Sequence, residues 1–234
     1  MKNVNAFIEE ACALFESYTI FDGEKVKKLK LSRCDNSFVG IGGEYYLNRI
    51  LNGELYQHYF DIVILIDKTN HFIIPIVWLP NEKKPYGFEH MYSDNTCCLG
   101  LTHEIILIWG KEQSAKDFFE KIVDIFLINL ISYRNTKRCA TPDRPHGEQG
   151  ILEYYGEILD IRLDKCLKAL NYIYDKVKRG IVAKGHHLCP CESGKRMREC
   201  HGQKIYSFIN DLNNNPELKA GFFLDVRFII DKRG

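Results

Sequence analysis

Residues Tyr56–Ile66 read YQHYFDIVILI, and this stretch decides the predicted fold class. Aromatic and β-branched side chains fill it, and such side chains fit a pleated, partly buried strand. A β-rich segment precedes it at Phe38–Leu47 and another follows it at His71–Trp78. The polar run Asp67–Asn70 before the last segment is typical of a hairpin turn. Residues 28–78 therefore predict a meander of about three or four antiparallel strands.

Helical periodicity is present on both sides of this β region. Apolar side chains recur there at the spacing of one helix face. Gly180 is expected to stop one long helix, and Pro216 is expected to open a last helix that ends near Ile230. The other predicted helices cover residues 4–19, 112–133, 151–179 and 203–212. We therefore expect an α+β protein with helices that flank the meander.

Composition narrows the class of protein. The chain has 234 residues, enough for one sizeable core and a small appendage. Its net charge of +1 argues against bulk attraction to nucleic acid or acidic membranes. No apolar run approaches the roughly 20 residues of a spanning helix, and Glu9, Glu10 and Glu16 interrupt any signal-peptide core. Nine cysteines, an odd number, fit a metal site plus free thiols in a reducing compartment. We expect a cytoplasmic protein with no membrane partner.

A histidine stands ahead of two adjacent cysteines in residues 90–99, HMYSDNTCCL. A thiol nucleophile needs a polar bend to expose it and neighbouring groups that shift its pKa or bind an oxyanion. His90 and the polar turn after it can supply these groups. Neighbouring side chains on extended backbone point in opposite directions, so we expect either Cys97 or Cys98 to face the core. The residues alone leave open which of the two is accessible.

With its surroundings, this segment resembles the active-site region of bacterial ubiquitin-conjugating-enzyme-like (UBC-like) proteins. The resemblance covers roughly residues 1–165 and implies a UBC-like fold. It identifies Cys98, followed by Leu99, as the catalytic cysteine. The supporting features, in chain order, are the predicted strands, Pro75, Pro80, Trp109 and Pro145–Tyr155 (PHGEQGILEYY).

The resemblance implies that Cys98 carries an acyl group as a thioester and passes it to an amine on a target protein. The implied partners are an activating enzyme and, as cargo, a ubiquitin-like protein or a nucleotidyltransferase C-terminus, in a bacterial conjugation or anti-phage defence system. His90 would organise the loop. Met91 follows it where eukaryotic ubiquitin-conjugating enzymes carry His-Pro-Asn, whose Asn is linked to oxyanion stabilisation. Either the donor comes from elsewhere or the activity is weak. Residue type alone offers three candidate donors: Asn95, His103 and His146.

The segment His187–Gly202, HLCPCESGKRMRECHG, brings cysteine and histidine together at the spacing of a metal site. The candidate ligands are Cys189, Cys191, Cys200 and His201. Three thiolates and one imidazole form a closed tetrahedral set, which is typical of structural rather than catalytic zinc. The pattern resembles the SEC-C motif, Cys-Pro-Cys-x-Ser-Gly-Lys followed by Cys-His or Cys-Cys, with Glu192 where glycine is commoner. His186 and His187 are alternative ligands of less suitable spacing.

The resemblance to UBC-like proteins implies a conjugating domain over 1–165, and the remaining pattern predicts a helical extension over 166–234 that contains a zinc knuckle at 184–202. A knuckle this short would fold only with its metal. Its basic side chains favour docking on a partner protein or nucleic acid, with a solvated surface as an equal alternative. These side chains are Lys184, Lys195, Arg196 and Arg198.

Two other functions fit the same residues. The chain could be a catalytically inactive UBC-like adaptor that recruits a partner through the knuckle, which the missing Asn after His90 favours. It could also be a cysteine hydrolase, which ranks lower because a β-meander precedes Cys98 and long apolar helices follow it. Cys98 could further be a buried apolar thiol. That last interpretation is preferred for Cys12, Cys34, Cys139 and Cys166.

Overall fold

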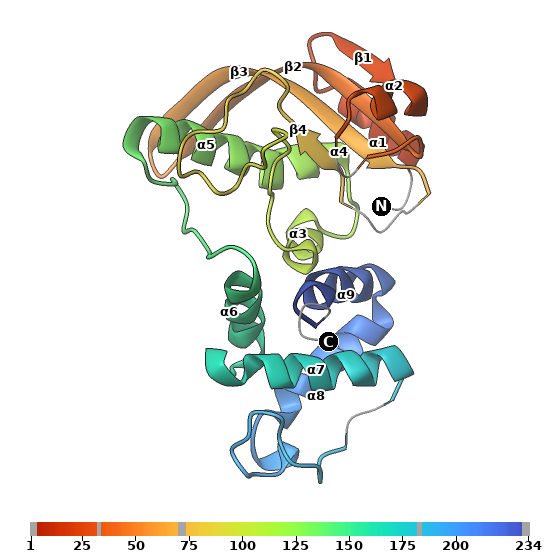
Figure 1. The fold of residues 1–234 in the computed structure, drawn as a ribbon, viewed down its shortest axis with the longest axis vertical. Helices are drawn as coiled ribbons and strands as arrows, with labels where there is room; N and C mark the ends of the chain where they lie inside the picture. Colours follow the sequence, from red (N-terminus) through yellow and green to blue (C-terminus); the bar gives the residue numbers. More distant parts are fainter. Residues whose placement is uncertain (1–3, 32–33, 70–73, 182–183, 231–234) are drawn as a thin grey trace. The chain divides into compact units, whose positions relative to one another are not determined.

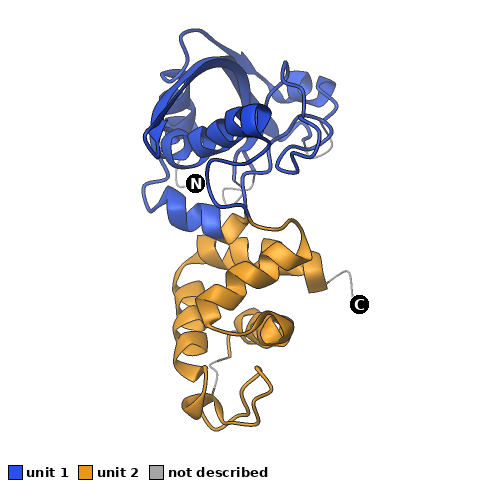
Figure 2. Cartoon of the chain, turned by 90° about the vertical axis from the view of Figure 1, so that its left-hand side faces the viewer, with its two compact units in different colours: residues 1–100, 104–143 blue, residues 101–103, 144–234 orange. Residues whose placement is uncertain are grey.

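The computed structural model divides the chain into two compact units (Figure 2). It describes residues 4–31, 34–69, 74–181 and 184–230. Unit 1 comprises residues 1–100 and 104–143, and unit 2 comprises residues 101–103 and 144–234. The predicted division at 165/166 therefore falls within unit 2.

A four-stranded antiparallel sheet forms the centre of the described part of unit 1, in the order β1-β2-β3-β4 (Figure 1). The strands are β1 (Tyr18–Phe21), β2 (Phe38–Leu51), β3 (Glu54–Asp67) and β4 (Ile76–Trp78). The predicted α+β class and antiparallel meander are thus confirmed. β2 and β3 pair along their whole length around Asn52-Gly53, whose φ angles of 53° and 82° suit a tight hairpin turn. The predicted strand at His71–Trp78 and turn at Asp67–Asn70 lie partly outside the described residues.

The first helix, predicted over residues 4–19, is shorter than expected. α1 (Val4–Cys12) ends early, and the next regular element is β1. β1 crosses the glycines of β2 at close range: a Cβ on Gly43 would collide with the Ser17 carbonyl oxygen, and one on Gly42 would lie 2.8 Å from the Phe21 ring. Phe15 still packs in the core, 6% exposed, from the segment between α1 and β1. Its apolar spacing therefore imitates a helix that the chain does not form.

Alternate side chains of β2 and β3 point to opposite faces of the sheet, and each face has its own cover. The larger core includes Ile41, Leu47 and Phe60 and packs against α1, α4 (Ala115–Phe118) and α5 (Asp124–Thr136). A π-helical turn, η1 (Phe119–Val123), joins α4 to α5, so this helical run replaces the helix predicted over 112–133. On the opposite face, α2 (Gly23–Lys28) covers Phe38, Val63 and Leu65.

Unit 2 is helical in its described residues. Its helices are α6 (Glu148–Leu159), α7 (Leu163–Arg179), α8 (Gly202–Asn214) and α9 (Pro216–Ile230), and α3 (Thr102–Trp109) begins in it. The single helix predicted over 151–179 is wrong. Asp160 adopts a left-handed φ of 56°, and the Ile161 amide donates to the Gly156 carbonyl at 2.9 Å, so α6 ends there.

Other helix boundaries agree with the sequence. Gly180 ends α7 in the left-handed conformation, and Pro216 opens α9, which ends at Ile230. In the ranges that the structure describes, no helix combines the length and the apolar character that crossing a membrane requires.

Candidate thiol site and metal centre

Residues 79–98, which follow β4, form a short lobe, and Cys98 lies at its end. The lobe folds back on itself at Tyr92–Asn95: the Tyr92 amide donates to the Thr96 carbonyl at 2.9 Å, and Asn95 adopts a left-handed φ of 63°. Asp94 Oδ1 accepts from the Thr96 amide at 3.0 Å and from its hydroxyl at 2.6 Å. The Trp78 indole donates to the Asp94 carbonyl at 2.9 Å and ties the turn to β4. The polar residues of the lobe therefore build its bend.

The lobe turns its two cysteines in opposite directions. The Cys97 amide donates to the Val77 carbonyl at 2.8 Å, and the Cys97 side chain is 5% exposed in the core beside Met91. The Cys98 amide donates to the His90 carbonyl at 2.7 Å, and Cys98 is only partly buried. The structure thus places Cys98, rather than Cys97, on the accessible side.

Polar groups surround the Cys98 thiol. Its Sγ lies within 4.8 Å of a ring nitrogen of His90. Burial by itself raises the pKa of Cys98, but hydrogen bonds with the His90 and Tyr92 side chains and the Gly100 backbone outweigh burial and lower it. Burial likewise lowers the pKa of His90, but its hydrogen bond with Cys98 and its contact with Asp143 raise it overall. Both shifts favour a thiolate beside an imidazolium.

Asp143 holds the His90 ring from the other side. A carboxylate oxygen of Asp143 lies 2.5 Å from His90 Nε2, with His90 23% and Asp143 53% exposed. The His90 ring also contacts the Phe88 ring edge-on, with centroids 5.5 Å apart, and Phe88 is 1% exposed in the core. His90 is therefore oriented by both a core aromatic ring and a carboxylate.

The loop that carries Asp143 is fastened to α5. Asn129 makes two hydrogen bonds to Thr141: its amide nitrogen donates to the hydroxyl at 2.8 Å, and its oxygen accepts from the backbone amide at 3.0 Å. Ser132 donates to the Arg138 carbonyl at 2.9 Å. These bonds fix the backbone at Arg138 and Thr141, shortly before Asp143. Asp143 could not be found from the sequence, because no spacing signal links a loop carboxylate to a histidine 53 residues earlier.

The candidate oxyanion donors lie in different settings. Asn95 forms the lobe's turn, where its carbonyl accepts from the Leu79 amide at 3.1 Å. His103 is 3% exposed within unit 2 and bonds to the Tyr154 hydroxyl at 2.9 Å, and burial lowers its pKa to about 4. A neutral, enclosed imidazole is unsuited to meet a substrate. His146 is partly buried in unit 2, just before α6, and its role at Cys98 stays a prediction.

The predicted metal ligands form a cluster in unit 2. One ligand atom from each of Cys189, Cys191, Cys200 and His201 lies within 4.8 Å of all the others. Cys189 Sγ is 3.6 Å from His201 Nδ1, Cys200 Sγ is 3.1 Å from the same atom, and the Cys191 and Cys200 sulfurs are 3.5 Å apart. Tetrahedral zinc bonds would separate such atoms by roughly 3.5–3.8 Å. Two of the three distances match this range, and the Cys200–His201 distance is shorter. The alternative ligands, His186 and His187, pack against each other outside this cluster.

The segment of the predicted knuckle packs into the core of unit 2. The Cys189 amide donates to the Lys195 carbonyl at 2.9 Å, which closes the turn between the ligand pairs. Met197 is fully buried, and it joins Cys189 and Cys191 in the core formed with α6, α7, α8 and α9. A Cβ on Gly202 would collide with the Met197 carbonyl, so the start of α8 packs directly on the knuckle.

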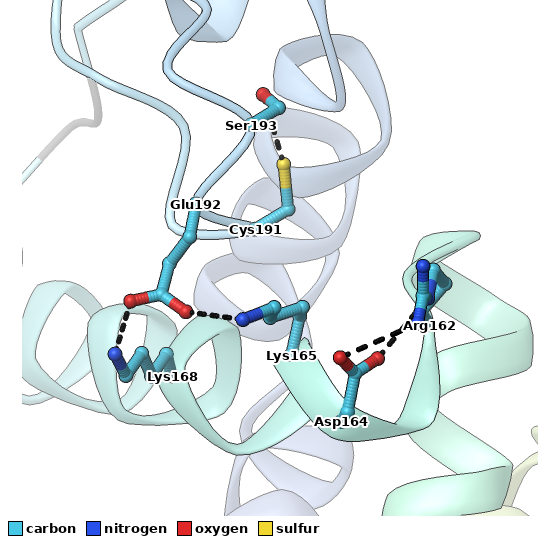
Figure 3. A network of polar contacts seen from close by, with 7 residues as sticks. All are labelled: Arg162, Asp164, Lys165, Lys168, Cys191, Glu192 and Ser193. Carbon is cyan, nitrogen blue, oxygen red and sulfur yellow. Dashed lines mark hydrogen bonds and ion pairs between the residues drawn. The ribbon is translucent and has the colours of Figure 1, made fainter.

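Glu192 lies in the turn between the two pairs of candidate metal ligands. It adopts a left-handed φ of 61°, a backbone conformation that favours glycine. Figure 3 shows its carboxylate between two lysines of α7: it accepts from Lys165 at 2.8 Å and also from Lys168. Hydrogen bonds from these lysines lower the pKa of Glu192 to about 2. Next to it, the Ser193 hydroxyl lies 3.3 Å from Cys191 Sγ (Figure 3).

Comparison with protein-family models, with curated proteins and with solved structures finds no match to this chain. Its function therefore has to be inferred from its two clusters. Cys98, His90 and Asp143 have the parts of an activated thiol: a nucleophile, a base beside it and a group that orients the base. The four residues around Cys189 could hold a metal ion.

Proposed function

We propose that this chain is a UBC-like acyl transferase that carries a protein C-terminus as a thioester on Cys98. The observation that carries the proposal is the Cys98 side chain itself, which is only partly buried, is hydrogen-bonded to His90 and Tyr92, and has a lowered pKa. An antiparallel meander followed directly by the lobe that ends at the cysteine agrees with the UBC-like arrangement suggested by the sequence. The cargo would be a ubiquitin-like protein or a nucleotidyltransferase C-terminus.

The chemistry would proceed in two acyl transfers. The Cys98 thiolate attacks the thioester carbonyl of a cargo held on an activating enzyme, and the thiolate of that enzyme leaves. A target amine then attacks the new thioester, loses a proton, and expels Cys98 as a thiolate. His90, kept protonated by Asp143, stabilises the thiolate at the start and at the end of this cycle. The same pair of residues therefore serves both loading and discharge.

We further propose that the four-ligand cluster is a SEC-C-like structural zinc site. Its closed ligand set would leave no position for substrate. Removing the metal would leave a group of thiols and an imidazole inside the core of unit 2, so zinc would hold α7 and α8 in place. The exposed basic side chains on the knuckle would serve recruitment of a partner. They are Lys184, Lys195, Arg196 and Arg198.

A trapping experiment tests the proposal and identifies the cargo at the same time. A tagged Cys98→Ser variant, made in the native cells, should accumulate a cargo as an oxyester that resists thiols but is cleaved by hydroxide. The wild-type adduct should be cleaved by thiols. Mass spectrometry of the adduct names the cargo and locates the bond. Cys97→Ser is the matched control and should still form the thiol-sensitive adduct on Cys98. An adduct bound to residue 97 and not to residue 98 would overturn the assignment.

A second candidate is a cysteine hydrolase, favoured by the contact of His90 with Asp143, because such a pair can also activate water. The two activities differ in the acceptor. Preloaded Cys98 thioester should discharge to added lysine much faster than to water if the chain is a transferase. Dominant discharge to water supports the hydrolase. Absence of any Cys98 adduct, with partner binding intact, supports the adaptor.

A further inference from the structure

A third cysteine lies beside the His90 and Asp143 pair. One ligand atom from each of His90, Cys139 and Asp143 lies within 4.8 Å of the other two. Cys139 Sγ is 3.9 Å from one Asp143 carboxylate oxygen, while His90 Nε2 is 2.5 Å from the other. All three residues belong to unit 1, so this cluster is separate from the knuckle.

Cys139 has no role in the thiol chemistry proposed for Cys98. Burial, followed by the adjacent Asp143 charge, raises the pKa of Cys139, so it is a poorer nucleophile than Cys98. At 3.9 Å its contact with the carboxylate is a weak hydrogen bond. A sulfur, an imidazole nitrogen and a carboxylate oxygen, here within 4.8 Å of one another, are, however, the three donor types that bind zinc. The cluster therefore calls for an explanation of its own.

The geometry points to a second metal site, and we propose that His90, Cys139 and Asp143 bind an exchangeable divalent cation of the zinc class. Three protein ligands leave the fourth position open to water, in contrast to the closed knuckle. The ligands are partly buried or exposed, so an ion can enter from solvent. The bonds of Asn129 and Ser132 hold the Cys139–Asp143 loop in place before any ion binds. A site organised in advance loses less entropy on binding.

Occupancy of this site has a direct consequence for Cys98. A cation bound through His90 and Asp143 replaces the contact that orients the His90 ring, and so disturbs the hydrogen bond between that ring and Cys98. Bound zinc would thus reduce the reactivity of the Cys98 thiol. The binding itself does not depend on the transferase proposal, because it needs only the three ligands. Its test can fail while Cys98 still forms thioesters, and it can succeed if Cys98 forms none.

The first measurement is metal stoichiometry. Native mass spectrometry of the full chain, titrated with Zn²⁺, should show one tightly held ion followed by a second, weaker one. Cys139→Ser should weaken the second binding event by at least about tenfold, since loss of even an outer-shell partner of a ligand costs roughly that much. Cys34→Ser is the matched control: it removes another partly buried thiol, which packs on the face of the sheet that α2 covers. It should retain both ions.

A second readout links the ion to Cys98. Zn²⁺ at the second-site concentration should slow alkylation of Cys98 by iodoacetamide in the wild type and in Cys34→Ser, followed peptide by peptide. The slowing should be lost in Cys139→Ser. With Co²⁺ as the probe, the second equivalent should add a sulfur-to-cobalt absorption that Cys139→Ser lacks. Uptake of only one ion by the wild type, or equal second-site affinity in Cys139→Ser, would overturn the proposal.

Discussion

His90 Nε2 and a carboxylate oxygen of Asp143 lie 2.5 Å apart, although 53 residues separate them in the chain. The contact joins the lobe after β4 to the loop after α5. It gives the histidine beside Cys98 a negative partner, and this is one reason that the pKa of His90 is raised. The reactivity of the thiol therefore depends on a residue that is remote in sequence.

Replacing His90 should raise the pH at which Cys98 reacts. The thiolate exists above the lowered pKa of Cys98 and is lost as the pH falls through it. His90→Gln removes the imidazole and the positive charge that help to lower this pKa, so the pH profile of iodoacetamide alkylation should move upward. Tyr92→Phe removes one hydrogen bond and should produce a smaller move in the same direction. Identical profiles for wild type and His90→Gln would contradict the assignment of the pair.

Asn129 should act on Cys98 only through the Asp143 loop. Asn129→Ala removes both hydrogen bonds to Thr141, which together stabilise the fold by about 1–3 kcal/mol. Because Asp143 then loses its fixed position, the alkylation profile of Cys98 should shift upward by less than in His90→Gln. Asn129→Asp keeps oxygen acceptors for the Thr141 amide and hydroxyl and should largely restore the profile. A purely structural role would lower the melting temperature in Asn129→Ala without moving the profile.

The fold class was predictable because two local signals were strong. Alternating and continuous apolar runs identify β2 and β3, and Pro216 marks the start of α9. The errors arose where apolar residues recur at helical spacing although the backbone between them is not one continuous helix. Phe15 reaches the core from a non-helical segment, and the apolar spacing continues from Leu159 to Leu163 across the break at Asp160. Neither event has a glycine or proline to announce it.

The candidate site was predictable only where its residues are close in sequence. Cys98 and His90 share one lobe, and the four metal-ligand candidates share one short motif with recognisable spacing. Asp143 and Cys139 arrive from a loop whose course is decided by α5 and by the bonds of Asn129. Tertiary structure brings them to His90, so local patterns contain no information about them.

Removal of the tightly held metal should unfold unit 2 selectively. Replacing Cys191 and Cys200 together with serine, or strong chelation, should abolish the zinc retained after purification and reduce helical circular dichroism. Both tryptophans, Trp78 and Trp109, lie in unit 1, so their fluorescence should change little. Cys166→Ser, which alters a buried thiol of α7 outside the ligand cluster, is the control and should keep its zinc. Full zinc retention in the double variant would exclude the site.

Asp225 should be the most sensitive acidic position of unit 2. It is 7% exposed on α9 and accepts from the Thr102 amide at 2.8 Å, the His103 amide at 3.0 Å and the Tyr155 hydroxyl at 3.0 Å. It thereby caps the first turn of α3 from a distant helix. Asp225→Ala leaves these buried donors without their carboxylate acceptor and should lower the free energy of unfolding by about 2–4 kcal/mol.

The pH dependence of this position has a definite sign. Burial raises the pKa of Asp225 although hydrogen bonds from the His103 and Thr102 amides oppose the rise. The folded chain therefore binds this proton more tightly than the unfolded chain, and the contribution of Asp225 to stability decreases as the pH rises from its ordinary pKa to its raised one. Urea unfolding, followed by circular dichroism, should show the largest loss in Asp225→Ala at low pH, where the protonated residue contributes most. Asp211→Ala removes an exposed acid of α8 and should change stability by less than about 0.5 kcal/mol. Equal losses in the two variants would mean that the cap contributes nothing.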